Sequence, residues 1–312
     1  ILGILEILIL YFAGNIGGFK YKESALVLGG AYNNLITYSD VKIKGKEMDL
    51  YFAGAEAFKK VLEEMKVTKE LFSYYNMTGS KAENLFERPR KIFLDSGGFS
   101  AFTQGAEIDI DEYCNFIKKH ESKINYYAQL DCIGDEKGTE RNLKHMESKG
   151  LTPLPVFHFK SDYKRLEALT NQYDYICLGG LVPLSRKKPT LIAHLDKCFS
   201  IIKDKAKVHG FGMTGMDILK RYPWFSVDST SWIEATKRGT YFEFKNGKMG
   251  MIPTADKKKA NYKSIAFSGK TKGLWRTRTI HGIKEWLKLE NFITRLWEKK
   301  GINFTITKTI EI

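Results

Sequence analysis

The chain has 312 residues, of which 43% are hydrophobic, and it carries 50 Lys and Arg against 36 Asp and Glu. This apolar content is enough for a large buried core, so the composition excludes a disordered chain and allows one or two domains. The net charge of +14 favours a polyanionic partner such as nucleic acid.

Eight short apolar runs of strand length follow one another along the chain. They cover residues 8–14, 48–54, 91–98, 126–131, 152–159, 175–181, 207–213 and 224–230. Continuous apolar runs are typical of parallel strands covered on both faces. Segments with helical spacing lie between several of them, at residues 161–174, 189–206 and 217–222. This alternation predicts an α/β fold, a (β/α)8 TIM barrel over residues 1–239, although an open doubly wound sheet has the same periodicity.

The first apolar stretch, ILGILEILIL, contains Glu6 and is too short to span a bilayer. We therefore expect a strand there, no membrane association and a cytoplasmic location, in the host if the chain is encoded by a phage. The four cysteines are widely spaced, with no C-x-x-C pair. They predict buried free thiols, with neither a zinc ribbon nor a disulfide framework, and no metal site is expected.

Residues 240–312 are expected to form a basic C-terminal extension. They hold sixteen Lys and Arg against six acidic residues. Basic residues interleaved with aromatic ones suit contacts to phosphates and bases, although a solvated basic face over ordinary core aromatics has the same composition. The glycines of GKTKGLWRTRTIHG (269–282) indicate a loop that follows a nucleic-acid backbone through Lys270, Lys272, Arg276 and Arg278. The aromatic residues of this region include Tyr262, Phe267, Trp275, Trp286 and Trp297.

Barrel enzymes carry their chemistry at the carboxyl ends of the strands. Three of the expected strands end in an acid, at Asp95, Asp131 and Asp228. An aspartate after a strand often caps the following turn, but three together with flanking glycines favour a functional site to which a flat ligand has close access. Carboxylates without metal-ligand partners suit chemistry at an anomeric carbon, with aromatic faces holding a planar leaving group. The other expected strand ends carry Gly14, Gly54, Ser96, His158, Gly179, Gly180, Gly212 and Met213.

The run FLDSGGF at residues 93–99, followed by Asp131, the GGL of residues 179–181 and Asp228, resembles the tRNA-guanine transglycosylase family and its relatives that insert 7-deazaguanine bases into DNA. The resemblance covers roughly residues 91–239. It implies a (β/α)8 barrel and a glycosyltransferase that exchanges guanine in a nucleic acid for a free 7-deazaguanine base of the preQ0 type. No cofactor is implied, because one N-glycosidic bond replaces another.

The resemblance assigns roles to individual residues. Asp228 would be the nucleophile that attacks C1′ and forms a covalent glycosyl-enzyme intermediate, and Asp95 the acid/base group. Asp131 would accept hydrogen bonds from N1–H and the exocyclic amine of guanine, because a carboxylate only accepts and that edge only donates. Further base contacts are implied for Ser96, for the backbone at Gly179 and Gly180, and for a sandwich of Phe99 with Phe211 or Met213 beside Gly212. Phe102 is expected to pack beneath the turn.

Two departures from the family pattern bear on the substrate. The tRNA enzymes carry a cysteine-rich zinc site after the nucleophile, whereas no cysteine follows Asp228 here, so no zinc subdomain is expected. The basic extension in its place favours DNA over tRNA. His158 stands where the family has a glutamine, and it either contacts the base or is an ordinary turn residue.

Three alternatives remain open at this stage. The chain could act on tRNA, or it could be a catalytically silent relative that binds nucleic acid as a partner subunit. It could also be an unrelated barrel hydrolase whose acids bind a metal. The presence of both Asp95 and Asp228 argues against the silent relative.

Overall fold

The computed structural model describes residues 48–55, 58–77, 90–252 and 274–302. Eight strands in these ranges form one all-parallel sheet in the order β4-β3-β2-β1-β8-β7-β6-β5. Their bounds are β1 Asp49–Ala53, β2 Lys69–Ser73, β3 Lys91–Asp95, β4 Tyr126–Tyr127, β5 Val156–His158, β6 Tyr175–Gly179, β7 Lys207–Gly210 and β8 Ser226–Ser229. Each expected run except residues 8–14 contains one of these parallel strands, and β2 was not expected.

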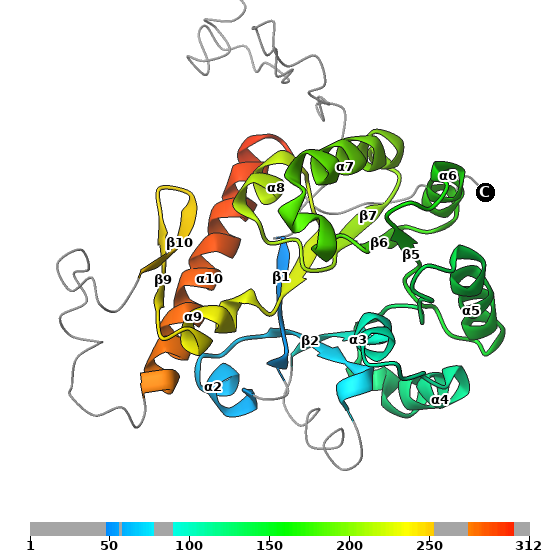
Figure 1. Cartoon of the computed structure of the whole chain (residues 1–312), viewed down its shortest axis with the longest axis horizontal. Helices are drawn as coiled ribbons and strands as arrows, with labels where there is room; N and C mark the ends of the chain where they lie inside the picture. The colour runs from blue at the N-terminus through cyan, green and yellow to red at the C-terminus, as the bar shows by residue number, and fades with distance from the viewer. Residues whose placement is uncertain (1–47, 56–57, 78–89, 253–273, 303–312) are drawn as a thin grey trace, which may run out of the picture.

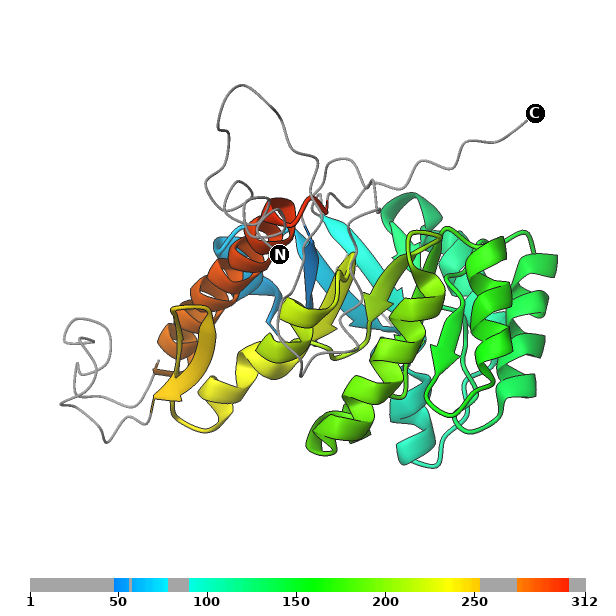
Figure 2. The same cartoon turned by 90° about the horizontal axis from the view of Figure 1, so that it is seen from above.

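The sheet is curled like a TIM barrel, with helices around it (Figure 1). An isolated parallel bridge between Ala128 and Leu154 links the chain just after β4 to the chain just before β5, so the two edges of the curled sheet approach each other there. Viewed from above, the strands lie in the middle of the molecule and the helices flank them (Figure 2). This arrangement brings the carboxyl ends of all eight strands to one end of the curled sheet.

Helices follow most of the strands, as the spacing predicts. Aspartates cap three of them, since Asp109, Asp135 and Asp162 each accept a backbone N–H of the first turn that follows. The α-helices are α2 Lys59–Glu64, α3 Gly98–Thr103, α4 Ile110–His120, α5 Glu136–Ser148, α6 Tyr163–Gln172, α7 Lys188–Ile202, α8 Met216–Arg221, α9 Glu234–Lys237 and α10 Leu274–Lys299. Short 3-10 turns are η2 Tyr74–Asn76, η5 Glu121–Lys123, η6 Val182–Arg186 and η7 Ser231–Ile233.

Strand β2, with the sequence KELFS, was missed at the sequence level because charged residues interrupt its apolar pattern. The charged side chains of Lys69 and Glu70 both form ion pairs within the fold. Glu70 is fully buried and pairs with Arg90 at 2.7 Å, while Lys69 lies 3.1 Å from the buried Asp49. The charged residues therefore belong to ion pairs, which a hydrophobicity pattern cannot reveal. The expected strand at 8–14, with Gly14, lies outside the described residues.

The amino-terminal end of the sheet is held by a buried ionic cluster. Asp49 on β1 contacts both Lys69 and Lys91, and Lys69 also lies 2.9 Å from Glu290 of α10. Glu290 accepts the Leu50 backbone N–H at 2.7 Å. An unpaired buried charge is costly, so removing one residue of this cluster would destabilise the others. Through Glu290, the cluster also connects α10 to β1.

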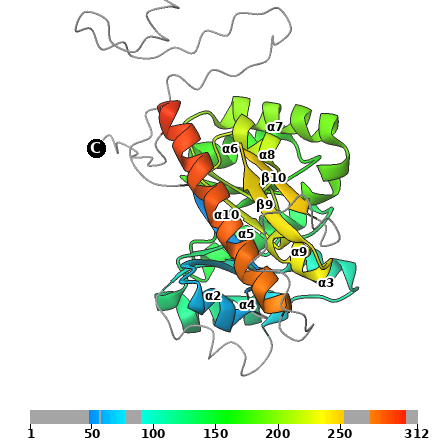
Figure 3. The same ribbon diagram turned by 90° about the vertical axis from the view of Figure 1, so that its left-hand side faces the viewer.

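Helix α10 runs along the flank of the sheet beside the hairpin of β9 (Tyr241–Lys245) and β10 (Lys248–Ile252) (Figure 3). Near its start it contacts η7 and α9, which follow the carboxyl end of β8. Towards its end, Glu290 reaches the beginning of β1 and the Trp297 indole donates to the Leu219 carbonyl at 2.9 Å. The first turn of α10 therefore lies at the end of the sheet that carries the strand carboxyl termini.

The prediction of a loop over residues 269–282 is wrong from residue 274 onward, because α10 begins there. Gly282 sits inside this helix for a packing reason: a Cβ there would lie 3.0 Å from the Trp232 carbonyl oxygen. Trp286 and Trp297 are core residues, 3% and 2% exposed, whereas Trp275 is 51% exposed. Tyr262 and Phe267 lie outside the described residues, and the division of the chain at residue 240 stays a prediction.

Within the ranges that the structure describes, no helix is both long and apolar enough to cross a membrane.

Two tryptophans of α10 should respond very differently to truncation. Trp297→Ala removes a buried indole and its hydrogen bond, so we expect the free energy of unfolding to fall by about 3–5 kcal/mol. Trp275→Ala, in the same helix but exposed, should change it by less than about 0.5 kcal/mol. Urea unfolding of both variants measures the difference. Equal losses would contradict the packing of α10 described above.

Candidate active site

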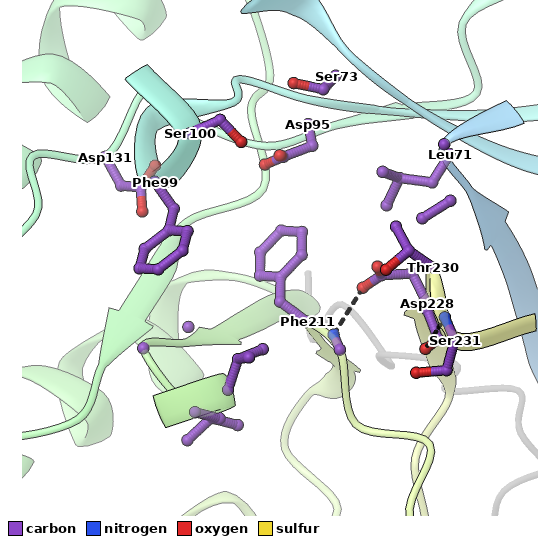
Figure 4. A pocket seen from close by; sticks show the side chains of 18 of the residues that line it. Leu71, Ser73, Asp95, Phe99, Ser100, Asp131, Phe211, Asp228, Thr230 and Ser231 are labelled. Atoms are coloured by element: carbon purple, nitrogen blue, oxygen red, sulfur yellow. Dashed lines mark hydrogen bonds between the residues drawn. The ribbon is translucent and has the colours of Figure 1, made fainter. Parts of the chain in front are cut away.

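A cavity of about 410 Å³ opens at the carboxyl ends of the strands. Its size falls within the range of about 300–1,000 Å³ typical of small-molecule sites. Asp95, Asp131 and Asp228 all line it, and the rings of Phe99 and Phe211 project into the space among them (Figure 4). Glycines contribute much of the remaining wall: Gly54, Gly179, Gly180 and Gly212.

Asp95 ends β3 and is followed by a tight turn. Gly97 has φ +80°, and a Cβ at this position would overlap Ser73 and Tyr75, so only glycine fits. The Gly97 N–H donates to Asp95 Oδ2 at 3.2 Å. Burial, together with the charges of Asp131 and Asp228, nevertheless raises the pKa of Asp95 to about 8. This carboxyl group thus holds a proton at neutral pH.

Asp131 is fixed from two sides. Ser96 Oγ donates to its Oδ1 at 3.2 Å, and His158 Nε2 lies 2.7 Å from its Oδ2. Ser96 is fully buried, and neither Ser96 nor His158 lines the cavity. The structure thus places these two predicted base contacts behind Asp131, where they orient the carboxylate.

Asp228 on β8 is 8% exposed. Its Oδ1 accepts the Gly212 backbone N–H at 2.9 Å, the bond drawn in Figure 4. Gly212 has φ +69°, and a Cβ there would lie 2.6 Å from Val182 Cγ2. The loop after β7 therefore needs glycine in order to present this N–H to Asp228.

The aromatic wall differs in part from the expectation. Phe99, 51% exposed, and the half-buried Phe211 line the cavity, whereas Met213 is 3% exposed and lies in the core. The prediction that Phe102 packs beneath the turn is wrong, because this side chain is 60% exposed. Phe99 and Phe102 are three residues apart on the short helix α3, but only Phe99 lines the cavity.

Gly179 and Gly180 lie where β6 ends. A Cβ on Gly179 would come within 2.7 Å of His158 Cδ2, and Gly180 has φ +68°. The first glycine makes room for the histidine that orients Asp131, and the second turns the chain along the cavity wall.

Several wall residues were not foreseen from the sequence. Ser73 is the last residue of the missed strand β2 and Asn76 lies in the turn after it, while Ser229, Thr230 and Ser231 come directly after Asp228. The polar run DSTS at residues 228–231 could have indicated the residues after Asp228 as part of the site. A further unforeseen residue is His209, whose Nε2 lies 3.3 Å from Asp228 Oδ1.

The predicted nucleic-acid contacts are only partly described. Arg276, on the first turn of α10, forms an exposed ion pair with Glu64. The Arg278 guanidinium lies 5.6 Å from the centre of the Tyr241 ring. Both arginines are near the cavity end of the sheet, while Lys270 and Lys272 lie outside the described residues.

Among the residues that the structure describes, no three His, Cys, Asp or Glu side chains are grouped so as to hold a metal ion. Neither models of known protein families nor curated proteins match this chain.

The raised pKa of Asp95 predicts a pH-dependent stability. Between 3.8, the ordinary value, and about 8, the unfolded chain releases this proton while the folded chain retains it. Rising pH therefore favours unfolding through this group. We expect wild type to lose stability relative to Asp95→Asn as the pH is raised across this window.

Urea unfolding of the two proteins at several pH values measures this effect, because contributions from groups that do not interact with Asp95 cancel in the comparison. Parallel pH profiles for wild type and Asp95→Asn would contradict the assigned pKa.

Proposed function

We propose that the protein is a (β/α)8-barrel glycosyltransferase that exchanges guanine in DNA for a 7-deazaguanine base through a covalent aspartyl intermediate. One observation carries the proposal: three carboxyl groups at one end of the sheet share one cavity, and two phenyl rings project into the space among them. Burial raises the pKa of one of the three, Asp95, to about 8. These are the parts needed to hold a planar base, protonate it and displace it from a sugar.

The purine would bind between the rings of Phe99 and Phe211, which present apolar faces to the cavity. Asp131 would accept hydrogen bonds from N1–H and the exocyclic amine of guanine. Ser96 and His158 fix this carboxylate beforehand, so little orientational freedom is lost on binding. Backbone N–H groups near Gly179 and Gly180 would donate to O6.

In the first half-reaction, a carboxylate oxygen of Asp228 attacks C1′ and forms an ester bond. The C1′–N9 bond breaks, and its electron pair goes to the base. The protonated Asp95 supplies the proton that neutralises the departing guanine, as its pKa of about 8 allows. Guanine then leaves and the sugar stays attached to the enzyme.

In the second half-reaction, N9 of the incoming base attacks C1′ and its proton passes to the Asp95 carboxylate. The ester bond to Asp228 breaks, and the electron pair returns to this carboxylate. Two displacements at one carbon restore the original configuration. Both aspartates end the cycle in their starting states, so no cofactor is consumed.

DNA is the proposed polymer because of the net charge of +14 and the arginines at the start of α10, near the cavity end. A guanine in a duplex must be flipped out of the stack, at a cost of a few kcal/mol that phosphate contacts would offset. The second candidate is tRNA, because the residues around FLDSGGF resemble both branches of the family. A tRNA loop can present its base already unstacked.

Incubation with labelled guanine and either DNA or tRNA tests the activity. We expect wild type to incorporate label into DNA and Asp228→Asn to incorporate none, because an amide cannot replace the carboxylate as nucleophile. Incorporation into tRNA alone would establish the second candidate. Undiminished exchange by Asp228→Asn would remove the assignment of the nucleophile.

Neutralising Lys270, Lys272, Arg276 and Arg278 should weaken DNA binding and reduce its salt dependence. Each lost phosphate contact lowers the slope of log K against log salt by about 0.9 on duplex DNA. A matched control removes four lysines near the amino ends of the strands: Lys118, Lys123, Lys149 and Lys203. Equal slopes for the two quadruple variants would show that the start of α10 does not contact DNA.

A further inference from the structure

His209 is a buried histidine next to the proposed nucleophile, and the mechanism above does not use it. It lies on β7, is fully buried, and stacks on Phe93 with ring centroids 4.3 Å apart. Its Nε2 is 3.3 Å from Asp228 Oδ1 and makes no hydrogen bond within the described residues. A buried polar atom without a partner is costly, so its position beside a reacting group calls for a role.

A short chain of polar groups sets the tautomer of this imidazole. His209 Nδ1 contacts Ser226 Oγ, which also contacts the hydroxyl of the buried Tyr175. Ser226 has a single hydroxyl proton. If Tyr175 donates to Ser226 and Ser226 donates to Nδ1, all three groups are satisfied and Nε2 carries the ring proton.

The opposite direction of these hydrogen bonds, from His209 through Ser226 to Tyr175, is unfavourable at both Tyr175 and His209. It would give the ring proton to Nδ1, leave the Tyr175 hydroxyl proton without its Ser226 acceptor, and point the Nε2 lone pair at the Asp228 carboxylate. Lone pairs facing each other in a buried site repel. We infer that the hydrogen bonds run from Tyr175 through Ser226 to His209, because this direction gives the hydroxyl protons of Tyr175 and Ser226 an acceptor each and directs the Nε2–H at Asp228.

The two oxygens of Asp228 are then unequal. Oδ1 accepts the Gly212 N–H at 2.9 Å and also faces His209 Nε2, whereas no described residue donates a hydrogen bond to Oδ2. An oxygen that is already hydrogen-bonded is a weaker nucleophile than one whose lone pairs are free. Oδ2 is thus the oxygen available to attack C1′.

We propose that His209, held by Ser226, is a positioning residue that fixes Oδ1 of Asp228 so that Oδ2 acts as the nucleophile. This inference rests on the proposed transglycosylase function. We expect this 3.3 Å contact to shorten to a hydrogen bond when the substrate is bound, because hydrogen bonds at reacting groups are often long before substrate binds. His209 gives up no proton during the cycle.

The same contact serves both half-reactions. Before attack it limits rotation of the carboxylate about Cβ–Cγ, which keeps Oδ2 aimed at the sugar. When the ester bond breaks in the second half-reaction, negative charge returns to Asp228, and the Nε2–H stabilises it. Loss of His209 should therefore slow turnover while leaving the binding of polymer and base unchanged.

The test compares His209→Phe with wild type in the base-exchange assay. Phenylalanine retains the ring that stacks on Phe93 but lacks both nitrogens. We expect kcat to fall by about 10–100-fold, as it does when a group that orients a reacting side chain is lost, with KM for polymer and base unchanged. Ser226→Ala, which releases the imidazole, should lower kcat in the same direction.

The matched control is His194→Phe, which removes another buried histidine that stacks on a phenylalanine, Phe157, away from the cavity. It should exchange bases at the wild-type rate. Wild-type kcat in His209→Phe would overturn the inference and leave the proposed function intact, whereas no exchange by wild type itself would reject the function. If His209→Phe does not fold, Ser226→Ala decides: an unchanged kcat overturns the inference.

Discussion

The burial of Asp95 beside two other carboxyl groups is the constraint on which the rest of the site depends. Asp95 is the last residue of β3, Asp228 lies within β8 and Asp131 follows β4 by four residues, and all three line the same cavity. Burial, followed by the charges of Asp131 and Asp228, raises the pKa of Asp95 to about 8, although this carboxyl group also accepts the Gly97 N–H. Asp131 accepts a hydrogen bond from Ser96, and Asp228 accepts one from the Gly212 N–H. The three identical side chains therefore have different surroundings.

The opposite end of the sheet uses charge for another purpose. There Asp49, Lys69, Lys91 and Glu290 form a buried cluster in which opposite signs are paired. This cluster ties α10 to the start of β1. One end of the curled sheet thus pairs opposite charges, while the other gathers three carboxyl groups around the cavity.

The sequence predicted the alternation of strands and helices and the acids at the strand ends, because both depend on local pattern. It could not reveal β2, whose charges are paired with residues far along the chain, Lys69 with Glu290 for example. His209 was missed for a related reason: a histidine within a strand has no local sign of facing Asp228. Phe102 was misassigned because the face that α3 exposes is set by tertiary packing.

Mass spectrometry of the protein denatured during turnover on guanine-containing DNA tests the central claim most directly. The account predicts that the sugar of the DNA strand is attached through an ester to the peptide that contains Asp228, and that adding free base before denaturation removes the adduct. An adduct on the peptide that contains Asp95, or base exchange without any adduct under conditions that preserve aspartyl esters, would contradict it.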